Sequence, residues 1–469
     1  MESGRRGGAA EGAGPAALRR TLTFRDLVVY GLLFIAPMAP VGIFGTLLAA
    51  SHGAITLVYV VATAAMACTA YSYAQMVRVA PRAGSVYTYA RVGLGEGAGF
   101  VAGWMAMLDY LLIPAVAYLF SGIALHALVP SVHQWVWTAL AVVVTTLLNL
   151  WGVRTAAVVG FVVLALELAV LVVFVGAAGY VLVTEGARRG WSEPFTGAGA
   201  FSPVAVLAAV SIAVLSFLGF DAIASFAEES AGGPRRVARA VLACLAVAGV
   251  LFAVQTYLAA LLAPVSAAGL AARPGEQGSA FYVTAEAAVG PWLGQLVAAG
   301  KAVGAAFAAL AGQAAAGRLL FAMARDRRLP RAMAEVDARH GVPRRALLGA
   351  AGVTLVAAVW AARRDDGLEQ LSSIVNVGAL TAFGLLHASV IGWFRFRARE
   401  RAGLPGVLRH VVVPVLGLAV VVAVLVAASP TAQAVGGCWL AVGLVWLAVQ
   451  YGRRSRPGGA GTEEGGAAG

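Results

Sequence analysis

The chain has 469 residues, of which 60% are hydrophobic and only 12% are charged, and its mean hydropathy is +0.84. This composition excludes a soluble globular domain and indicates a membrane protein along its whole length. Its formal net charge is +12. Arginines retained on the cytoplasmic side and in contact with anionic lipid account for that charge, so no nucleic-acid partner is expected.

Apolar stretches long enough to cross about 30 Å of hydrocarbon recur along the chain. We predict twelve spans, at about residues 27–50, 54–77, 98–125, 135–151, 156–183, 203–227, 238–263, 291–323, 345–362, 371–394, 409–428 and 434–451. With the N-terminus inside, 28 arginines fall in inner segments and five in outer ones. Because basic residues are retained in the cytoplasm, we predict that both termini are cytoplasmic.

The two ends of the chain differ from its middle. Residues 1–21 and 453–469 have compositions typical of disordered tails, which leaves 22–452 as one membrane domain. The first apolar run is too long for a cleavable signal, so we expect the mature protein to begin near its first residue. The three cysteines lie singly in different spans, which predicts neither a disulfide nor a metal site.

Four ionisable residues lie well inside the apolar stretches: Asp109, Glu167, Asp221 and Lys301. A charge at the bilayer centre costs roughly 2.5–3.5 kcal/mol on insertion scales, so such residues usually face a packed interior or a water-filled path. They favour a protein that moves a polar substrate or an ion across the membrane.

Spans one and six are each interrupted by residues that disturb a helix. The first contains IAPMAPVGIFG (35–45) with two prolines and two glycines, and the sixth contains SFLGFDAIASFAEES (216–230). Broken helices at membrane depth are tolerated where they line a cavity or are satisfied by protein. Two breaks five spans apart predict inverted repeats with a binding site at midplane. Ordinary kinks and packing glycines are the alternative.

Other functional classes fit less well. The six histidines are scattered, and we find neither a catalytic constellation nor a phosphate-binding loop, so we expect no enzyme activity, no cofactor and no ATP-driven step. The short link between spans six and seven argues against a parallel six-plus-six carrier. A channel and a non-transporting nutrient sensor remain open alternatives.

Several longer motifs carry a family resemblance. They are IAPM (35–38), TAYSYAQMVRVAPRAGSVYTYA (69–90), GFVAGWMAMLDY (99–110), GFDAIASFAEES (219–230) and GRLLFAMARDRRLP (317–330). With them the chain resembles the amino acid, polyamine and organocation permeases, in particular the bacterial putrescine-importer-like and amino acid permease branch. The similarity extends from about residue 22 to 450.

The resemblance implies an all-α integral membrane protein of twelve transmembrane helices in the cytoplasmic membrane. Helices one and six are discontinuous within a five-plus-five inverted repeat, followed by two further helices. Repeat one would cover about 27–183, repeat two about 203–394, and the additional helices about 409–451. The implied activity is secondary active transport by alternating access, commonly coupled to protons.

The resemblance also implies where substrate binds. It places the substrate against unwound segments at 37–42 and 217–221, with these contacts: Ala36, Pro37, Met38, Gly42, Phe217, Gly219, Phe220 and Asp221. Phe217 and Phe220 would cover a bound amine by a cation-π attraction of about 0.5–2 kcal/mol. The alternative is that both rings face lipid or the protein core.

The four intramembrane charges are the candidates for coupling or gating. Asp221 would hold a substrate amine or gate the site, or else cap the second half-helix. Glu167 would bind and release a proton, or simply pair with Lys301. Lys301, the only lysine, would occupy the space of a sodium site, or else orient helices by pairing with an acid. Asp109 would face the cavity or bond to a neighbouring helix.

Substrate choice is balanced between an amino acid and a polyamine such as putrescine. A diamine needs acids at both ends, and Gly42 stands where the polyamine-importing pattern often has an additional acid. We therefore favour an amino acid, with a proton as coupling ion and lipid as the other partner. The oligomeric state, and whether transport is symport or exchange, stay open.

Overall fold

A computed structural model of the protein describes residues 22–81, 84–151, 153–199, 201–227, 230–325, 329–337, 343–398 and 403–454. The predicted tails lie outside these ranges, except that the last helix runs through residue 454. Within these ranges the structure is helical and has no β-strand, only one isolated bridge between Leu22 and Ser230.

The helices of the first half follow one another with short links. They are α1 (Phe24–Ile35), α2 (Ala39–Ala50), α3 (Ile55–Val79), α4 (Ser85–Gly93), α5 (Glu96–Leu128), α6 (Gln134–Trp151), α7 (Val153–Thr184), α8 (Glu193–Thr196), α9 (Pro203–Ala213), the 3₁₀ turn η1 (Val214–Phe217) and α10 (Ala222–Ser225). A capping box begins α1, because the Thr23 hydroxyl accepts from the Asp26 amide and the Asp26 carboxylate accepts from the Thr23 amide.

The second half repeats the pattern of long helices. Its elements are α11 (Gly233–Leu262), α12 (Ala267–Ala271), η2 (Pro274–Ser279), α13 (Ala280–Val289), α14 (Pro291–Arg325), η3 (Arg331–Ala334), α15 (Arg344–Ala362), α16 (Gly367–Ile391), the π-helical turn η4 (Gly392–Arg397), α17 (Leu404–Val407), the π-helical turn η5 (Leu408–Val412), α18 (Val413–Ala427) and α19 (Pro430–Arg454).

These helices account for the predicted spans. Among the described residues ten helices are long and apolar enough to cross a membrane, and the bent pair α1 and α2 adds an eleventh span. The predicted span at 135–151 corresponds to α6, a shorter apolar helix. The molecule is thus an all-α integral membrane protein whose first and sixth spans are broken.

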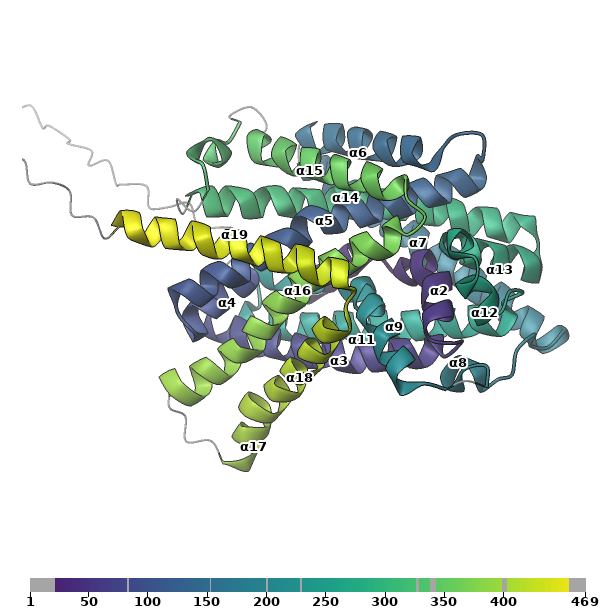
Figure 1. Ribbon diagram of the computed structural model, residues 1–469, viewed down its shortest axis with the longest axis horizontal. Helices are drawn as coiled ribbons and strands as arrows, with labels where there is room; N and C mark the ends of the chain where they lie inside the picture. The colour runs from purple at the N-terminus through teal and green to yellow at the C-terminus, as the bar shows by residue number, and fades with distance from the viewer. Residues whose placement is uncertain are drawn as a thin grey trace, which may run out of the picture.

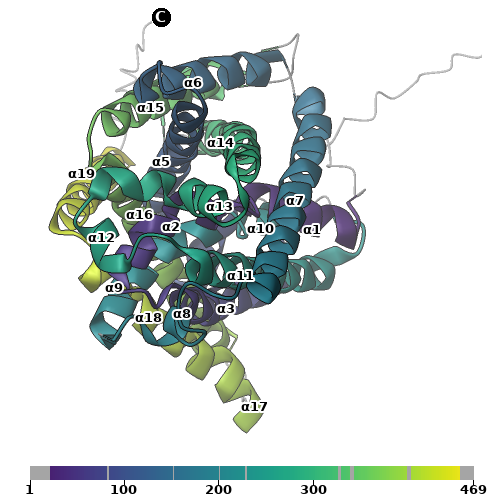
Figure 2. The same cartoon turned by 90° about the vertical axis from the view of Figure 1, so that its right-hand side faces the viewer.

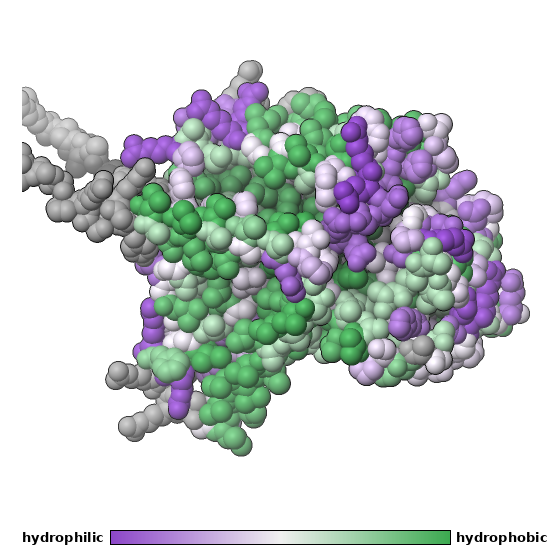
Figure 3. Space-filling model, viewed as in Figure 1, coloured by the Kyte–Doolittle hydropathy of each residue, from purple (hydrophilic) through white to green (hydrophobic). Residues whose placement is uncertain are grey.

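The long helices run roughly along the longest axis of the molecule, and the quarter-turned view looks down α14 (Figures 1 and 2). Apolar surface gathers over α18 and α19, and polar surface toward the end that carries α12 and α13 (Figure 3). Large apolar side chains on α18 stay exposed, Val426 among them at 75%. An apolar surface of this kind is expected to face the hydrocarbon of the membrane.

The first break is shorter than the sequence predicted. Helix α1 ends at Ile35 and α2 begins at Ala39, with a bend of 46° between them, so only residues 36–38 are non-helical. Pro40 is the second residue of α2, where a missing amide hydrogen leaves no helical bond unmade. The predicted unwinding through Gly42 is therefore wrong, because these residues start the second half-helix instead of extending the break.

The sixth span is broken at the predicted place. Helix α9 tightens into η1, the chain unwinds at Leu218, and Gly219 adopts φ +112° before α10 resumes. A Cβ on Gly219 would lie 3.0 Å from the backbone of Phe34, so glycine is needed both for the angle and for the close approach. This contact places the two breaks side by side.

Candidate functional site

A small cavity lies where the two breaks meet. It encloses about 80 Å³ and is lined by residues next to both breaks and by the facing sides of α5 and α14. One water needs about 10–15 Å³ of such space, so the cavity has room for several water-sized groups. The polar or ionisable side chains that line it are Asp109, Tyr110, Ser216, Asp221 and Lys301.

The room in this cavity comes from α14. The residues of α14 that follow Lys301 in sequence and line the cavity are all small: Ala305, Ala308, Ala309, Gly312 and Ala315. Spacings of three and four residues place them on one face of the helix. Gly312 also lets α14 approach α5, because a Cβ there would lie 3.2 Å from the Pro114 ring. Small residues of this kind allow close helix packing in membranes.

Two carboxyl groups face the cavity. Asp221 is 5% exposed, and its Oδ2 accepts a 3.1 Å hydrogen bond from the Tyr110 hydroxyl. Asp221 precedes α10 but makes no capping hydrogen bond with its side chain, so the capping alternative finds no support. Asp109 is 7% exposed, and its Oδ1 has no hydrogen-bond partner. A buried carboxylate oxygen without a donor is costly, which makes it a natural partner for a bound cation.

Lys301 forms a hydrogen bond with the backbone at the first break. Its Nζ donates a 3.0 Å hydrogen bond to the Met38 carbonyl and lies 4.7 Å from the centre of the Phe120 ring. Within the described residues no carboxylate forms an ion pair with it inside 4.0 Å. The alternative in which Lys301 pairs directly with an acid is therefore not what this conformation shows.

Gly42 makes the position of Phe120 possible. A Cβ on Gly42 would lie 2.6 Å from the Phe120 ring, which is closer than side-chain contacts allow. The ring that covers the Lys301 ammonium thus fills the space beside this glycine. Gly42 does not line the cavity itself, and the lack of a side chain there serves packing.

A second side chain serves the neighbouring carbonyl of the break. Gln255 on α11 is fully buried and donates a 3.0 Å hydrogen bond from Nε2 to the Pro37 carbonyl. The carbonyl groups of Pro37 and Met38 therefore both accept hydrogen bonds from buried side chains, and that of Met38, the N-cap of α2, also accepts from the Val41 amide. Such satisfaction is required for irregular backbone at membrane depth.

Glu167 lies behind this arrangement and outside the cavity. It is 1% exposed, its Oε1 has no hydrogen-bond partner, and it packs so tightly on α14 that a methyl group on Gly304 would overlap it. Gly304 is one turn from Lys301, and the two opposite charges interact electrostatically without forming a close ion pair. Glu167, on α7, is thus placed to influence Lys301 on α14, the helix against which it packs.

Of the eight predicted substrate contacts, three line the cavity, and Pro37, Met38 and Gly42 at the first break do not. Ala36, Gly219 and Asp221 line the cavity. Phe217 and Phe220 do not, because both rings are fully buried in aromatic clusters. Phe217 packs on Tyr59 and Phe252, and Phe220 on Tyr73 and Phe383. The core alternative describes them correctly in this conformation, and Phe120 is the ring that meets a cation.

Sequence reasoning missed three contributors to the site. They are Tyr110, Phe120 and Gln255. A signal for the first two existed, since Asp109, Phe120 and the lining residues between them share one face of α5. Gln255 is a buried polar residue of the seventh span, as is Thr256 beside it, and nothing in the sequence indicated which helix Gln255 faces.

Comparison with known proteins places this architecture in a family. The model of the family described as amino acid permease matches residues 27–445, which include both breaks and all four intramembrane charges. The chain belongs to the amino acid permease family. It is therefore a multi-pass membrane transporter.

Relatives within this family differ in the substrates that their names state. The chain is 30% identical to the low-affinity putrescine importer PlaP of Escherichia coli (strain K12), over 92% of this chain and 93% of the relative. It is 26% identical to the branched-chain amino acid permease BcaP of Lactococcus lactis subsp. cremoris (strain MG1363), over 93% and 95%. It is 27% identical to the vacuolar cationic amino acid transporter 4 of Arabidopsis thaliana, over 81% and 64%.

Proposed function

We propose that this permease imports amino acids across the cytoplasmic membrane by alternating access, driven by protons, with both chain termini in the cytoplasm. The observation that carries the substrate class is the pairing of charges in one cavity. Asp109 and Asp221 offer carboxylates, and Lys301 offers an ammonium. A zwitterionic substrate presents the complementary pair, an ammonium and a carboxylate.

In this proposal the two carboxyl groups bind the substrate ammonium, and Lys301 with the first break binds the substrate carboxylate. The substrate ammonium would approach Asp109, whose Oδ1 lacks a donor, and Asp221, whose second oxygen is already held by Tyr110. The substrate carboxylate would face Lys301 and the first break. Burial strengthens both attractions, because charges in a desolvated site interact more strongly than in water.

Putrescine import is the second candidate. It is favoured by the presence of two carboxylates in the same cavity, and the E. coli relative is named as a putrescine importer. The glycine at position 42 does not weigh against it, since the Phe120 ring takes that space. A diamine would, however, meet the Lys301 ammonium as a like charge, whereas an α-carboxylate would be attracted to it.

Proton coupling is proposed to act through Glu167 on Lys301. An ionised Glu167 favours the lysine ammonium at the first break, where it bonds to the Met38 carbonyl. Protonation of Glu167 removes that attraction and frees Lys301 to turn toward the substrate or to release the half-helix. The orphaned Oε1 of Glu167 and its packing on the helix of Lys301 support this role.

The test is uptake into proteoliposomes that contain the purified protein. Radiolabelled neutral amino acids, basic amino acids and putrescine are compared with and without an inward proton gradient, and in sodium-free buffer. We expect gradient-dependent accumulation of an amino acid without sodium. Accumulation of putrescine alone would establish the second candidate instead, and a sodium requirement would contradict the assignment of Lys301.

An Asp109→Asn variant separates the two candidates further. For putrescine this change removes one of two required charges and should abolish uptake. For an amino acid, Asp221 still holds the ammonium, so affinity falls without loss of transport. Equal uptake by wild type and variant for every substrate would remove Asp109 from the site.

A further inference from the structure

A second concave site lies on the outer surface of the molecule, between α6 and α15. The groove has a volume of about 600 Å³ and is lined by Ala139, Leu355, Val356, Val359, Trp360, Arg363 and Arg364. It shares no residue with the cavity at the helix breaks. Its size falls in the range of small-molecule sites.

The wall of this groove is apolar and faces the surroundings of the helix bundle. Leu355, Val356 and Val359 lie along α15, and Val356 is 71% exposed. These residues belong to a predicted membrane span, so hydrocarbon rather than water is their expected surrounding. A ligand that follows this wall must therefore carry an acyl chain.

The end of the groove is cationic. Arg364 donates to Asp366 at 3.1 Å and lies over the Trp360 ring, and this bond holds the pKa of the Asp366 carboxyl below its ordinary value. The ion pair of Arg364 with Asp366 therefore carries no net charge. Arg363 lies 4.6 Å from the centre of the Trp135 ring, and no carboxylate of the described residues forms an ion pair with it. Among the described residues, the groove thus ends at one guanidinium that forms no ion pair.

Arg363 differs in this respect from the arginines that we predict on the same side of the membrane. Each of the others bonds to a carbonyl or carboxylate of the chain: Arg188 to Ala287, Arg189 to Ala263, Arg273 to Glu276 and Arg364 to Asp366. Basic residues are disfavoured on that side, so an arginine kept there without such a partner needs an explanation.

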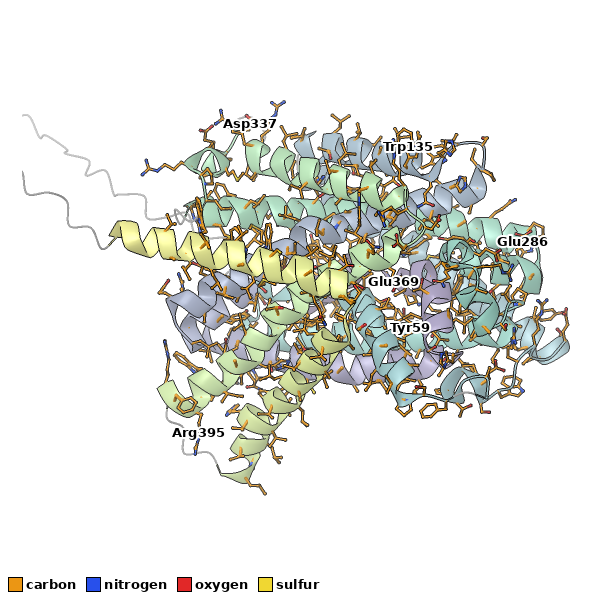
Figure 4. The ribbon with its side chains drawn as sticks, viewed as in Figure 1. Tyr59, Trp135, Glu286, Asp337, Glu369 and Arg395 are labelled. Atoms are coloured by element: carbon orange, nitrogen blue, oxygen red, sulfur yellow. The ribbon has the colours of Figure 1, made fainter. Side chains whose placement is uncertain are left out.

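Tryptophans mark the level of the groove in the membrane. Trp135 lies near the turn that joins α15 to α16 (Figures 1 and 4), and Trp360 is 41% exposed at the end of α15. Tryptophan rings concentrate at the headgroup level of a bilayer. The cationic end of the groove therefore stands where lipid phosphates lie, and the apolar wall stands where acyl chains lie.

We propose that this groove binds one anionic phospholipid, with its phosphate on Arg363 and an acyl chain along α15. The guanidinium supplies hydrogen-bond donors and charge for phosphate oxygens. A free phosphate ion would use only the arginine and leave the apolar wall without a role. The site lies apart from the transport cavity, so the proposal holds or fails independently of the substrate.

Native mass spectrometry of the purified protein, titrated with phosphatidylglycerol, tests this site. We expect one phosphatidylglycerol to bind more tightly than phosphatidylcholine. Arg363→Gln should weaken it about fivefold, from the loss of one arginine at an anionic surface. The matched control is Arg273→Gln, an arginine of the same side outside the groove, which should leave binding unchanged.

A wall variant keeps the test decisive if the arginine variant is poorly folded. Val356→Asn should weaken phosphatidylglycerol binding while leaving uptake and thermal stability as in wild type. Equal phosphatidylglycerol affinity in wild type, Arg363→Gln and Val356→Asn would overturn the proposal. Displacement of the lipid by millimolar inorganic phosphate would overturn it as well, because it would show a site for the free ion.

Discussion

The two helix breaks carry opposite charges. At the first break the carbonyl groups of Pro37 and Met38 accept hydrogen bonds from Gln255 and Lys301, so the surrounding helices bring it a cation. At the sixth break the chain itself supplies an anion, Asp221, which accepts from Tyr110. The two breaks thus build a cavity with a positive and a negative side.

This difference gives the cavity one side suited to an anionic group and one side suited to a cationic group. The path of the backbone at each break depends on a few local residues, whereas the cation at the first break depends on which helix packs against it. Only one break has a lysine within reach, and only the other carries a carboxylate in its own sequence. Each variant below changes either a charged group of the site or the packing beside it.

The largest effect is expected at the sixth break. Asp221→Asn keeps the shape of the side chain and removes the charge that is proposed to pair with the substrate ammonium. Loss of one member of such a buried charge pair costs about 2–5 kcal/mol. We therefore expect uptake, measured as kcat/KM in proteoliposomes, to fall about 100-fold or more. Thermal stability is the control and should change little. Wild-type kinetics in this variant would remove Asp221 from substrate binding.

Glu167→Gln should affect coupling more than binding. One elementary charge moving inward at 100 mV supplies about 2.3 kcal/mol, which corresponds to roughly fiftyfold accumulation. The variant should bind substrate and exchange it, but lose this accumulation and the pH dependence of uptake. Steady-state accumulation across an imposed proton gradient gives the measurement. Unchanged accumulation with the same pH profile would exclude Glu167 from coupling.

Lys301→Met tests the cation at the first break. The change removes the side-chain donor to the Met38 carbonyl, which keeps its hydrogen bond from the Val41 amide, and leaves the Phe120 ring without its ammonium, at a cost of about 1–3 kcal/mol. We expect about tenfold weaker uptake, read from KM. Gln255→Leu is the matched control, since it removes the neutral donor to the Pro37 carbonyl. If KM for uptake rises by the same factor in Lys301→Met and Gln255→Leu, the charge of Lys301 has no role beyond that of a hydrogen-bond donor.

The smallest effect is expected from Gly42→Ala. The new methyl group would displace the Phe120 ring that covers Lys301, which overpacks the site by about 1 kcal/mol. Uptake should fall a few-fold, and thermal stability should fall with it. Gly176→Ala is the control, because a Cβ at Gly176 meets no atom within 4 Å. Equal uptake and equal thermal stability in the two variants would show that Gly42 has no packing role.

Much of the fold could be predicted because membrane spans and helix breaks are written in local composition. Each of the twelve apolar stretches coincides with a helix or a broken helix, and Gly219 marks the sixth break. The extent of the first break was predicted less well. Pro40 can end a helix or begin one, and only the path of the chain after Ala36 decides between these roles.

The candidate site could be predicted only in part. The chain's sequence indicated its charged members, Asp109, Asp221 and Lys301, because a charge in an apolar stretch needs a polar surrounding. It could not indicate that Phe217 and Phe220 turn into the core while Phe120 meets the ammonium. Aromatic residues are compatible with either place, so packing between distant helices decides.

By itself the sequence determined that this chain is a helical membrane protein with two interrupted spans and four charges at depth. Those features follow from hydrophobicity and from the backbone limits of proline and glycine, which act over a few residues. Tertiary structure alone decided which side chain donates to each carbonyl of the first break and which carboxylate oxygens have no hydrogen-bond partner. Hydrogen bonds such as that of Lys301 to Met38 join residues far apart in the chain, and only packing brings them together.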